Sequence, residues 1–230
     1  MVSYPVPDRP RQREKMRGMA SLQGLVVFDL DGTLLRGLTV CEVLAAPLGR
    51  IEEMRRFEAL TAQTEIAAAR SEMARWYGDT LREDLIESLS AVQWAPGAAE
   101  GIDRLREAGV HVGIASITWD FAVSWFADKL GVKHFLGTGL EQDGRIRHVW
   151  PEDKARWVES LALQLQVPHE RIAAVGDSTG DTAMLKAAAL PLFVGMHPPP
   201  GSSFVLRPEA NILALAQEIL STWRVAAGKR

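Results

Sequence analysis

The chain has 230 residues, a formal net charge of −3 and a hydrophobic fraction of 47%, which are ordinary values for a soluble globular protein. Its single cysteine, Cys41, excludes an intramolecular disulfide and any zinc or iron–sulfur site built from several cysteines. The near-balanced charge gives no support for nucleic-acid binding, and no apolar stretch approaches the roughly 18 residues that a membrane-spanning helix needs.

Residues 1–20 differ in composition from the rest of the chain. Residues 4–17 contain three prolines and five basic side chains, and they lack the apolar core of a secretory signal peptide. We therefore expect residues 1–20 to form a disordered basic tail. Without an export signal, the expected location is the cytoplasm.

The body of the chain begins with a short apolar run, Leu25–Phe28, which is rich in β-forming residues and predicts a buried strand. Residues 38–94 show no clear strand pattern and are rich in Ala, Glu, Arg and Leu. They predict a helical cap domain inserted after the first strand. Residues 21–37 and 95–230 would then form the core domain.

From residue 95 onward, expected strands alternate with expected helices. The further apolar runs that predict strands are Val110–Ser116, Ile172–Val175 and Leu192–Val194. The amphipathic segments that predict helices are residues 98–108, 121–130, 153–166, 181–189 and 210–223. Asp143 and Gly144 predict a small hairpin between Leu140 and Ile146. This alternation predicts an α/β protein with a Rossmann-like, three-layer parallel-sheet core.

Carboxylates follow two of the expected strands at their C-terminal ends. Asp29 and Asp31 follow the first strand, Asp177 follows the strand at 172–175, and Asp181 lies four residues later. Because ligands of open α/β sheets bind outside these strand ends, we expect the four side chains to converge. Clustered carboxylates repel one another unless a cation neutralises them, and Mg²⁺ is the expected ion if a phosphate completes its coordination.

A hydroxyl group and an amine are expected beside these carboxylates. Ser116 ends the second strand, and Lys154 opens the helix that precedes the strand at 172–175. A hydroxyl donor and a positive charge both suit phosphate oxygens. The set is therefore suited to a phosphate group that is bound next to a metal ion.

In this chain order, these residues resemble the four motifs of the haloacid-dehalogenase superfamily. Residues 26–35, VVFDLDGTLL, are similar to the first motif, Ser116 to the second, Lys154 to the third and residues 176–181, GDSTGD, to the fourth. The resemblance covers about residues 22–200. Within the superfamily the chain is most similar to the phosphoserine-phosphatase-like branch, which has a helical cap between its first two motifs.

The resemblance implies a mechanism. Asp29 would attack phosphorus to form an aspartyl-phosphate, and Asp31 would protonate the leaving alcohol and later deprotonate the hydrolytic water. Mg²⁺ would be held by Asp29, the main-chain carbonyl of Asp31 and Asp177, with Asp181 as a metal ligand or as support for the ligands. The residues of the second and third motifs would clamp the phosphoryl oxygens. Dehalogenases of the superfamily use no metal and lack an acid such as Asp31, so a phosphatase is favoured.

The cap positions that would recognise substrate depart from that branch. Leu38 stands where a glutamate would bind a substrate ammonium, so the favoured substrate has a neutral or apolar group beside its phosphate ester. The arginine that would bind a substrate carboxylate could be either Arg70 or Arg75.

The core loops also depart from the pattern. Ile117 begins the pair of residues that replaces two glycines, and Trp119 follows as a candidate substrate contact. Gly180 replaces an asparagine before the last motif aspartate. These changes affect substrate recognition and leave the catalytic set intact.

The expected function is Mg²⁺-dependent hydrolysis of a small phosphomonoester metabolite, without nucleic-acid or membrane partners. Two alternatives remain open at the level of sequence. The first is a phosphotransferase or phosphomutase on the same scaffold, and the second is a non-catalytic binding module with this fold. The sequence indicates neither the identity of the substrate nor the oligomeric state.

Overall fold

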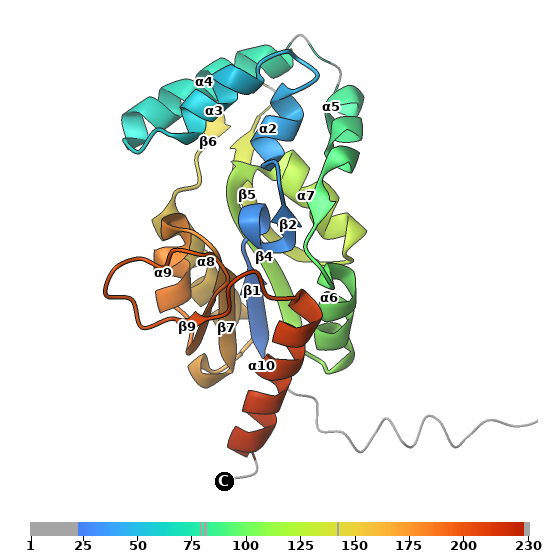
Figure 1. Cartoon of the computed structure of the whole chain (residues 1–230), viewed down its shortest axis with the longest axis vertical. Coiled ribbons are helices and arrows are strands. Elements are labelled where there is room, and N and C mark those ends of the chain that lie inside the picture. Colours follow the sequence, from blue (N-terminus) through green and yellow to red (C-terminus); the bar gives the residue numbers. More distant parts are fainter. Residues whose placement is uncertain (1–22, 79, 81, 142, 228–230) are drawn as a thin grey trace, which may run out of the picture.

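The computed structural model describes residues 23–78, 80, 82–141 and 143–227 (Figure 1). The expected basic tail, residues 1–20, lies outside these described residues. Every helix in the described part of the chain is too short or too polar to cross a membrane.

A seven-stranded sheet forms the centre of the molecule, with the strand order β6-β5-β4-β1-β7-β8-β9. β6 runs antiparallel to β5, and all other neighbours in the sheet are parallel. The strands are β1 Leu25–Phe28, β4 His111–Trp119, β5 His134–Leu140, β6 Ile146–Arg147, β7 Ile172–Gly176, β8 Leu190–Phe193 and β9 Val205–Leu206. β1 therefore lies between β4 and β7, and the C-terminal ends of these three strands meet at one edge.

Helices cover both faces of the sheet, because successive side chains of a strand point to opposite faces. Val26 and Phe28 of β1 join one apolar cluster with α6, α7 and α10, whereas Leu25 and Val27 join a second cluster with α8 and α9. These helices are α6 Ala98–Glu107, α7 Asp120–Lys129, α8 Pro151–Gln164, α9 Thr182–Lys186 and α10 Ile212–Ala227. The expected α/β fold with three layers is confirmed.

Several boundaries differ from those expected, because hydrogen bonding to neighbouring strands extends or shifts an element. β4 continues beyond Ser116 to Trp119, which pairs with Thr138 of β5. β8 begins two residues before its expected start. The helix expected at 181–189 is a 3₁₀ turn, Thr179–Asp181, followed by the short α9. The hairpin expected at 140–146 is present as the antiparallel pair β5–β6.

The described residues of segment 38–94 are mainly helical, and Figure 1 shows helices α2 to α4 over one end of the sheet. The helices are α2 Val40–Ala45, α3 Ile51–Glu58, α4 Gln63–Gly78, α5 Arg82–Ser88 and the 3₁₀ turn Leu89–Ala91. Where the chain leaves and re-enters the core, β2 (Leu35–Arg36) pairs antiparallel with β3 (Gln93–Trp94), a pair that was not predicted from the sequence. The division of the chain into a core domain and a cap domain stays a prediction.

Candidate active site

The polar site lies where β1, β4 and β7 end. Asp29 follows β1 directly, and its main-chain N–H donates to the carbonyl of Val175 on β7 at 2.8 Å. Ser116 lies on β4, and Asp177 follows β7. The parallel register of the three strands therefore brings residues more than 60 positions apart in sequence to one edge of the sheet.

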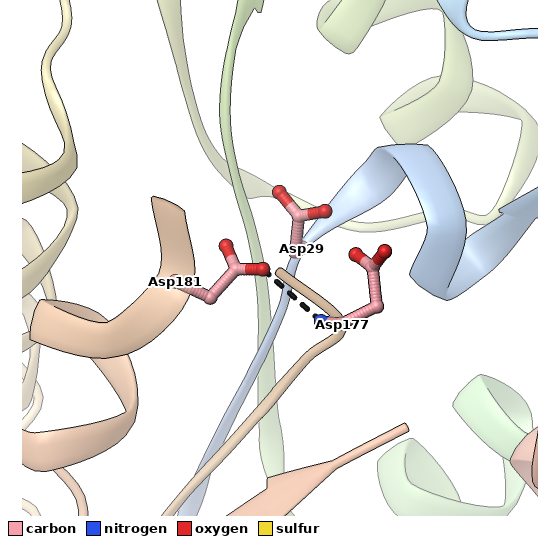
Figure 2. Close-up of side chains that lie close together, drawn as sticks. All are labelled: Asp29, Asp177 and Asp181. Carbon is pink, nitrogen blue, oxygen red and sulfur yellow. Dashed lines mark hydrogen bonds between the residues drawn. The ribbon is translucent and has the colours of Figure 1, made fainter. Parts of the chain in front are cut away.

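Three carboxylates face one another at this edge (Figure 2). Asp29, Asp177 and Asp181 each offer one ligand oxygen, and these oxygens all lie within 4.8 Å of one another. Carboxylate oxygens are the donors that hard divalent cations such as Mg²⁺ prefer. The donor set therefore fits a hard divalent cation.

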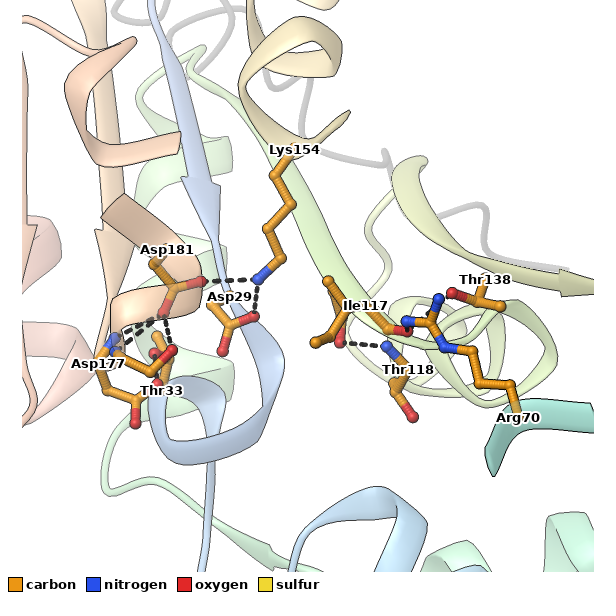
Figure 3. Close-up of polar contacts among 11 residues, drawn as sticks. Asp29, Thr33, Arg70, Ile117, Thr118, Thr138, Lys154, Asp177 and Asp181 are labelled. Carbon is orange, nitrogen blue, oxygen red and sulfur yellow. Dashed lines mark hydrogen bonds and ion pairs between the residues drawn. The ribbon is translucent and has the colours of Figure 1, made fainter. Parts of the chain in front are cut away.

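Lys154, on the first turns of α8, is buried between two of these carboxylates (Figure 3). Its Nζ lies 2.5 Å from Oδ1 of Asp29 and 2.7 Å from Oδ1 of Asp181. Burial lowers the pKa of Lys154, but the charges of Asp181 and Asp29 raise it by more, so the amine stays protonated. Removing this charge would leave two buried carboxylates facing each other without compensation.

Asp181 also organises the loop that carries Asp177. Its Oδ2 accepts hydrogen bonds from the main-chain N–H groups of Asp177 and Ser178, each at 3.1 Å, and from the Ser178 hydroxyl at 3.0 Å. Both oxygens of Asp181 therefore have protein partners in this structure. This arrangement favours the supporting role, of the two that the sequence left open for this residue.

Asp31 lies in the turn after β1, facing Val40, the first residue of α2. Its Oδ1 accepts a hydrogen bond from the main-chain N–H of Val40 at 2.7 Å. Burial raises the pKa of Asp31 to about 7, and the charge of Glu58 adds to the shift. A carboxyl group with such a pKa can both donate and accept a proton near neutral pH, as a general acid and base must.

The carboxylates beside Asp31 are also held in a poorly solvated environment. Burial, followed by the charge of Asp181, raises the pKa of Asp29 well above its usual range, although Lys154 opposes the shift. Burial and the charge of Asp181 also raise the pKa of Asp177 to about 6. A bound divalent cation would stabilise the ionised forms of both groups.

These pKa values predict that the metal-free protein is most stable in mild acid. Carboxyl groups such as Asp31 and Asp177 have pKa values of about 4 in an unfolded chain, so between about pH 4 and pH 7 the folded state binds more protons. The free energy of unfolding then falls as the pH rises through this range. We expect the melting temperature in EDTA to be higher at pH 5 than at pH 8, and Mg²⁺ to restore it at pH 8. A melting temperature in EDTA that rises from pH 5 to pH 8 would contradict this account.

Gly32 allows the turn after β1 to pass close to Asp177. Its φ is +76°, and a Cβ at this position would collide with the Asp177 carboxylate. Gly144, in the β5–β6 hairpin, has a similar φ of +81° but no atom within 4 Å of a Cβ. Gly32 therefore has both a conformational and a steric reason to lack a side chain.

We expect Gly32→Ala to destabilise the fold more than its matched control, Gly144→Ala. The left-handed backbone alone should cost about 1–2 kcal/mol in each variant. The collision with Asp177 should cost Gly32→Ala roughly a further 1–3 kcal/mol, as overpacking does. Urea unfolding of the two variants measures both terms, and equal losses would show that Asp177 is not displaced.

A cavity of about 470 Å³ begins at these carboxylates and extends beneath α3 and α4. It is lined by Ser116 and by the expected substrate contacts Arg70, Ile117, Trp119 and Gly180. Trp119 is only 1% exposed and packs edge-on against Tyr77, with ring centroids 5.7 Å apart.

The other two expected substrate contacts lie outside this cavity in the described structure. Arg75 is largely exposed, and its guanidinium pairs with Glu72 at 2.7 Å. Leu38 is 43% exposed, although its neighbours Gly37 and Thr39 line the cavity. Of the two candidate arginines, the structure thus brings only Arg70 to the site.

Most of the cavity wall was not predicted from the sequence. Glu58, at the end of α3, and several apolar residues of the cap line the cavity: Met54, Phe57, Leu60, Ile66 and Met73. Helical spacing indicates that α3 is amphipathic, but it does not distinguish a face that lines a cavity from one that packs in the core. No motif marks Glu58.

The sequence model of the haloacid dehalogenase-like hydrolases matches residues 26–186. The chain belongs to this family. A phosphoserine phosphatase of Idiomarina loihiensis is 30% identical over 193 residues, covering 78% of this chain and 86% of that protein. A phosphoserine phosphatase of Archaeoglobus fulgidus is 30% identical over 175 residues, covering 72% of this chain. This chain spans only about half the length of the Archaeoglobus protein, with 51% of it covered.

Solved structures show the same fold. A substrate-bound phosphoserine phosphatase complex matches with a TM-score of 0.72 and 23% identity, covering 87% of this chain and 98% of that one. A phosphoserine phosphatase with an analogue of the phospho-aspartyl intermediate matches equally well, with a TM-score of 0.72. The expected membership of the superfamily, and of its phosphoserine-phosphatase-like branch, is confirmed.

Proposed function

We propose that the chain is a Mg²⁺-dependent phosphatase that hydrolyses a small phosphomonoester metabolite through an aspartyl-phosphate intermediate. Its enzyme class is that of the phosphomonoester hydrolases. The observation that carries the proposal is the position of Asp29, which is held by Lys154 at one end of a substrate-sized cavity and faces Asp177. The curated relatives named as phosphoserine phosphatases support the same reaction class.

Asp29, Asp177 and the main-chain carbonyl of Asp31 would hold the Mg²⁺. When bound, the ion supplies positive charge that offsets the negative charge on the phosphoryl group and on the attacking carboxylate. The charge of Asp181 raises the pKa of both Asp29 and Asp177 in the metal-free protein, and this repulsion supports a cation at this place.

The first half-reaction transfers the phosphoryl group to the enzyme. A carboxylate oxygen of Asp29 attacks phosphorus, and the bond from phosphorus to the alcohol oxygen breaks. Asp31, whose pKa burial raises to about 7 in the metal-free protein, gives its proton to that oxygen. Lys154 contacts Asp29 directly and would orient its carboxylate towards the substrate.

The second half-reaction returns the enzyme to its starting state. Asp31, now ionised, takes a proton from a water molecule as that water attacks phosphorus. The bond between phosphorus and Asp29 breaks, releasing inorganic phosphate and the Asp29 carboxylate. Ser116 and Lys154 line the cavity beside Asp29 and would bind phosphoryl oxygens through both steps.

The proposal is tested by an assay with a generic aryl phosphate, with and without Mg²⁺. Metal-dependent phosphate release is expected. If no phosphate ester released phosphate, the phosphatase proposal would fail and the alternative of a non-catalytic binding module would be favoured. Product analysis in ¹⁸O-labelled water distinguishes hydrolysis from phosphoryl transfer, because only hydrolysis places the label in inorganic phosphate.

The cytoplasmic location stays a prediction.

A further inference from the structure

The active-site cavity has two chemically different ends. The carboxylates and Lys154 form one end, and the other is formed largely by apolar side chains of the cap helices α3 and α4. A phosphate ester bound with its phosphorus at Asp29 would extend its alcohol portion towards that apolar wall. Burial of apolar surface there favours an apolar alcohol portion.

Among the described residues that line the cavity, the cationic side chains are Lys154 and Arg70, and both have protein partners. The Arg70 Nη2 donates to the carbonyls of Ile117 at 2.9 Å and Val149 at 3.1 Å, and Nη1 lies 3.2 Å from Nδ1 of His148. Figure 3 shows the guanidinium turned towards the Ile117 carbonyl. Arg70 thus ties α4 to the core, so a carboxylate on the substrate would compete with these contacts.

Glu58 adds a negative charge to the cap side of the cavity. Its Oε1 accepts a hydrogen bond from the Thr39 hydroxyl at 2.5 Å, and within the described structure its Oε2 accepts none. The side chain is accessible to solvent. A hydroxyl or ammonium group on the alcohol portion of a substrate would give Oε2 a donor, whereas a carboxylate would be repelled.

We propose that the substrate is a phosphomonoester of an apolar alcohol that lacks a carboxylate and carries a hydrogen-bond donor, and that Glu58 binds this donor. This inference rests on the proposed phosphatase function, because it places the phosphorus at Asp29. The inference makes Glu58 a specificity-determining residue of the site. It also makes L-phosphoserine, whose carboxylate lies close to its phosphate, a poor substrate.

A ladder of ethyl, butyl and hexyl phosphate tests the apolar wall. Each added methylene that leaves water should raise kcat/KM about fourfold, and L-phosphoserine should be slower than butyl phosphate. Titration calorimetry of the same esters against the Asp29→Asn protein with Mg²⁺ gives the affinities without turnover. Affinities independent of chain length, or a kcat/KM for L-phosphoserine above that of butyl phosphate, would overturn the inference.

Glu58→Gln tests the donor site, with Glu52→Gln as the matched control. Glu52 lies on the same helix but outside the cavity, where it pairs with Arg55. In the wild type, an ω-aminoalkyl phosphate of suitable length should exceed the alkyl phosphate of equal length about tenfold in kcat/KM. Glu58→Gln should reduce this ratio several-fold, and Glu52→Gln should leave it unchanged.

The two proposals fail in different ways. An unchanged ratio in Glu58→Gln, with Mg²⁺-dependent hydrolysis intact, would overturn the role of Glu58 alone. If no ester were hydrolysed, the phosphatase function would fail, and the calorimetric affinities of alkyl, ω-aminoalkyl and carboxylate-bearing phosphates would still decide which ligand the cavity prefers.

Discussion

Replacing Asp29 with asparagine should reduce kcat at least about a thousandfold, because an amide cannot attack phosphorus and no covalent intermediate can then form. The fold should persist, since Lys154 keeps its contact with Asp181. Steady-state phosphate release measures the loss. A crystal structure of the wild type with beryllium fluoride should show the analogue on the Asp29 carboxylate.

Asp103→Asn is a matched control for this variant. Asp103 lies on α6, with its side chain 64% exposed and paired with Arg106, so the same chemical change there should leave kcat unchanged. Circular dichroism and melting temperature would show that both variants fold. If Asp29→Asn retained more than about a tenth of the wild-type kcat, Asp29 could not be the covalent nucleophile.

Removing the metal should also cause a large loss of activity. EDTA should abolish activity and Mg²⁺ should restore it, because the buried carboxylates and the dianionic ester repel one another without a cation. Ca²⁺ should bind yet inhibit, since its larger and looser coordination disturbs the geometry of attack. Activity measured across a titration of each ion after chelation tests both statements.

Asp177→Ala should raise the Mg²⁺ concentration needed for half-maximal activity at least about tenfold, because one of the expected ligands is lost. Asp143→Ala, in the β5–β6 hairpin, removes an exposed carboxylate that pairs with Arg145 and should leave this concentration unchanged. Full activity in excess EDTA would point to metal-free chemistry instead.

The main elements of the core could be predicted because their signals are local. A strand buried on both faces appears in the sequence as an apolar run, as in Leu25–Phe28. The amphipathic helices between strands are marked by apolar residues at helical spacing and by residues typical of helix ends. The ends of elements were less predictable. β4 continues to Trp119 because β5 offers it a hydrogen-bonding partner, and the sequence of β4 does not contain that information.

The candidate catalytic residues could also be predicted from the sequence, because they lie at the C-terminal ends of strands. Asp29 and Asp177 directly follow β1 and β7, and a parallel sheet brings such positions to one edge. The contacts of Lys154 with Asp29 and Asp181 span 125 and 27 residues, so their geometry became visible only in the folded chain.

The sequence by itself determined the class of this protein, its three-layer core and the residues at its strand ends, because strand periodicity and motif order are properties of short segments. The tertiary structure decided what surrounds the substrate. Arg70 and Arg75 lie five residues apart on α4, about 140° around the helix, so only the packing of α4 on the core shows that Arg70 faces the cavity. Glu58 and the apolar wall likewise reach the site through the packing of α3 and α4, which depends on contacts distant in sequence.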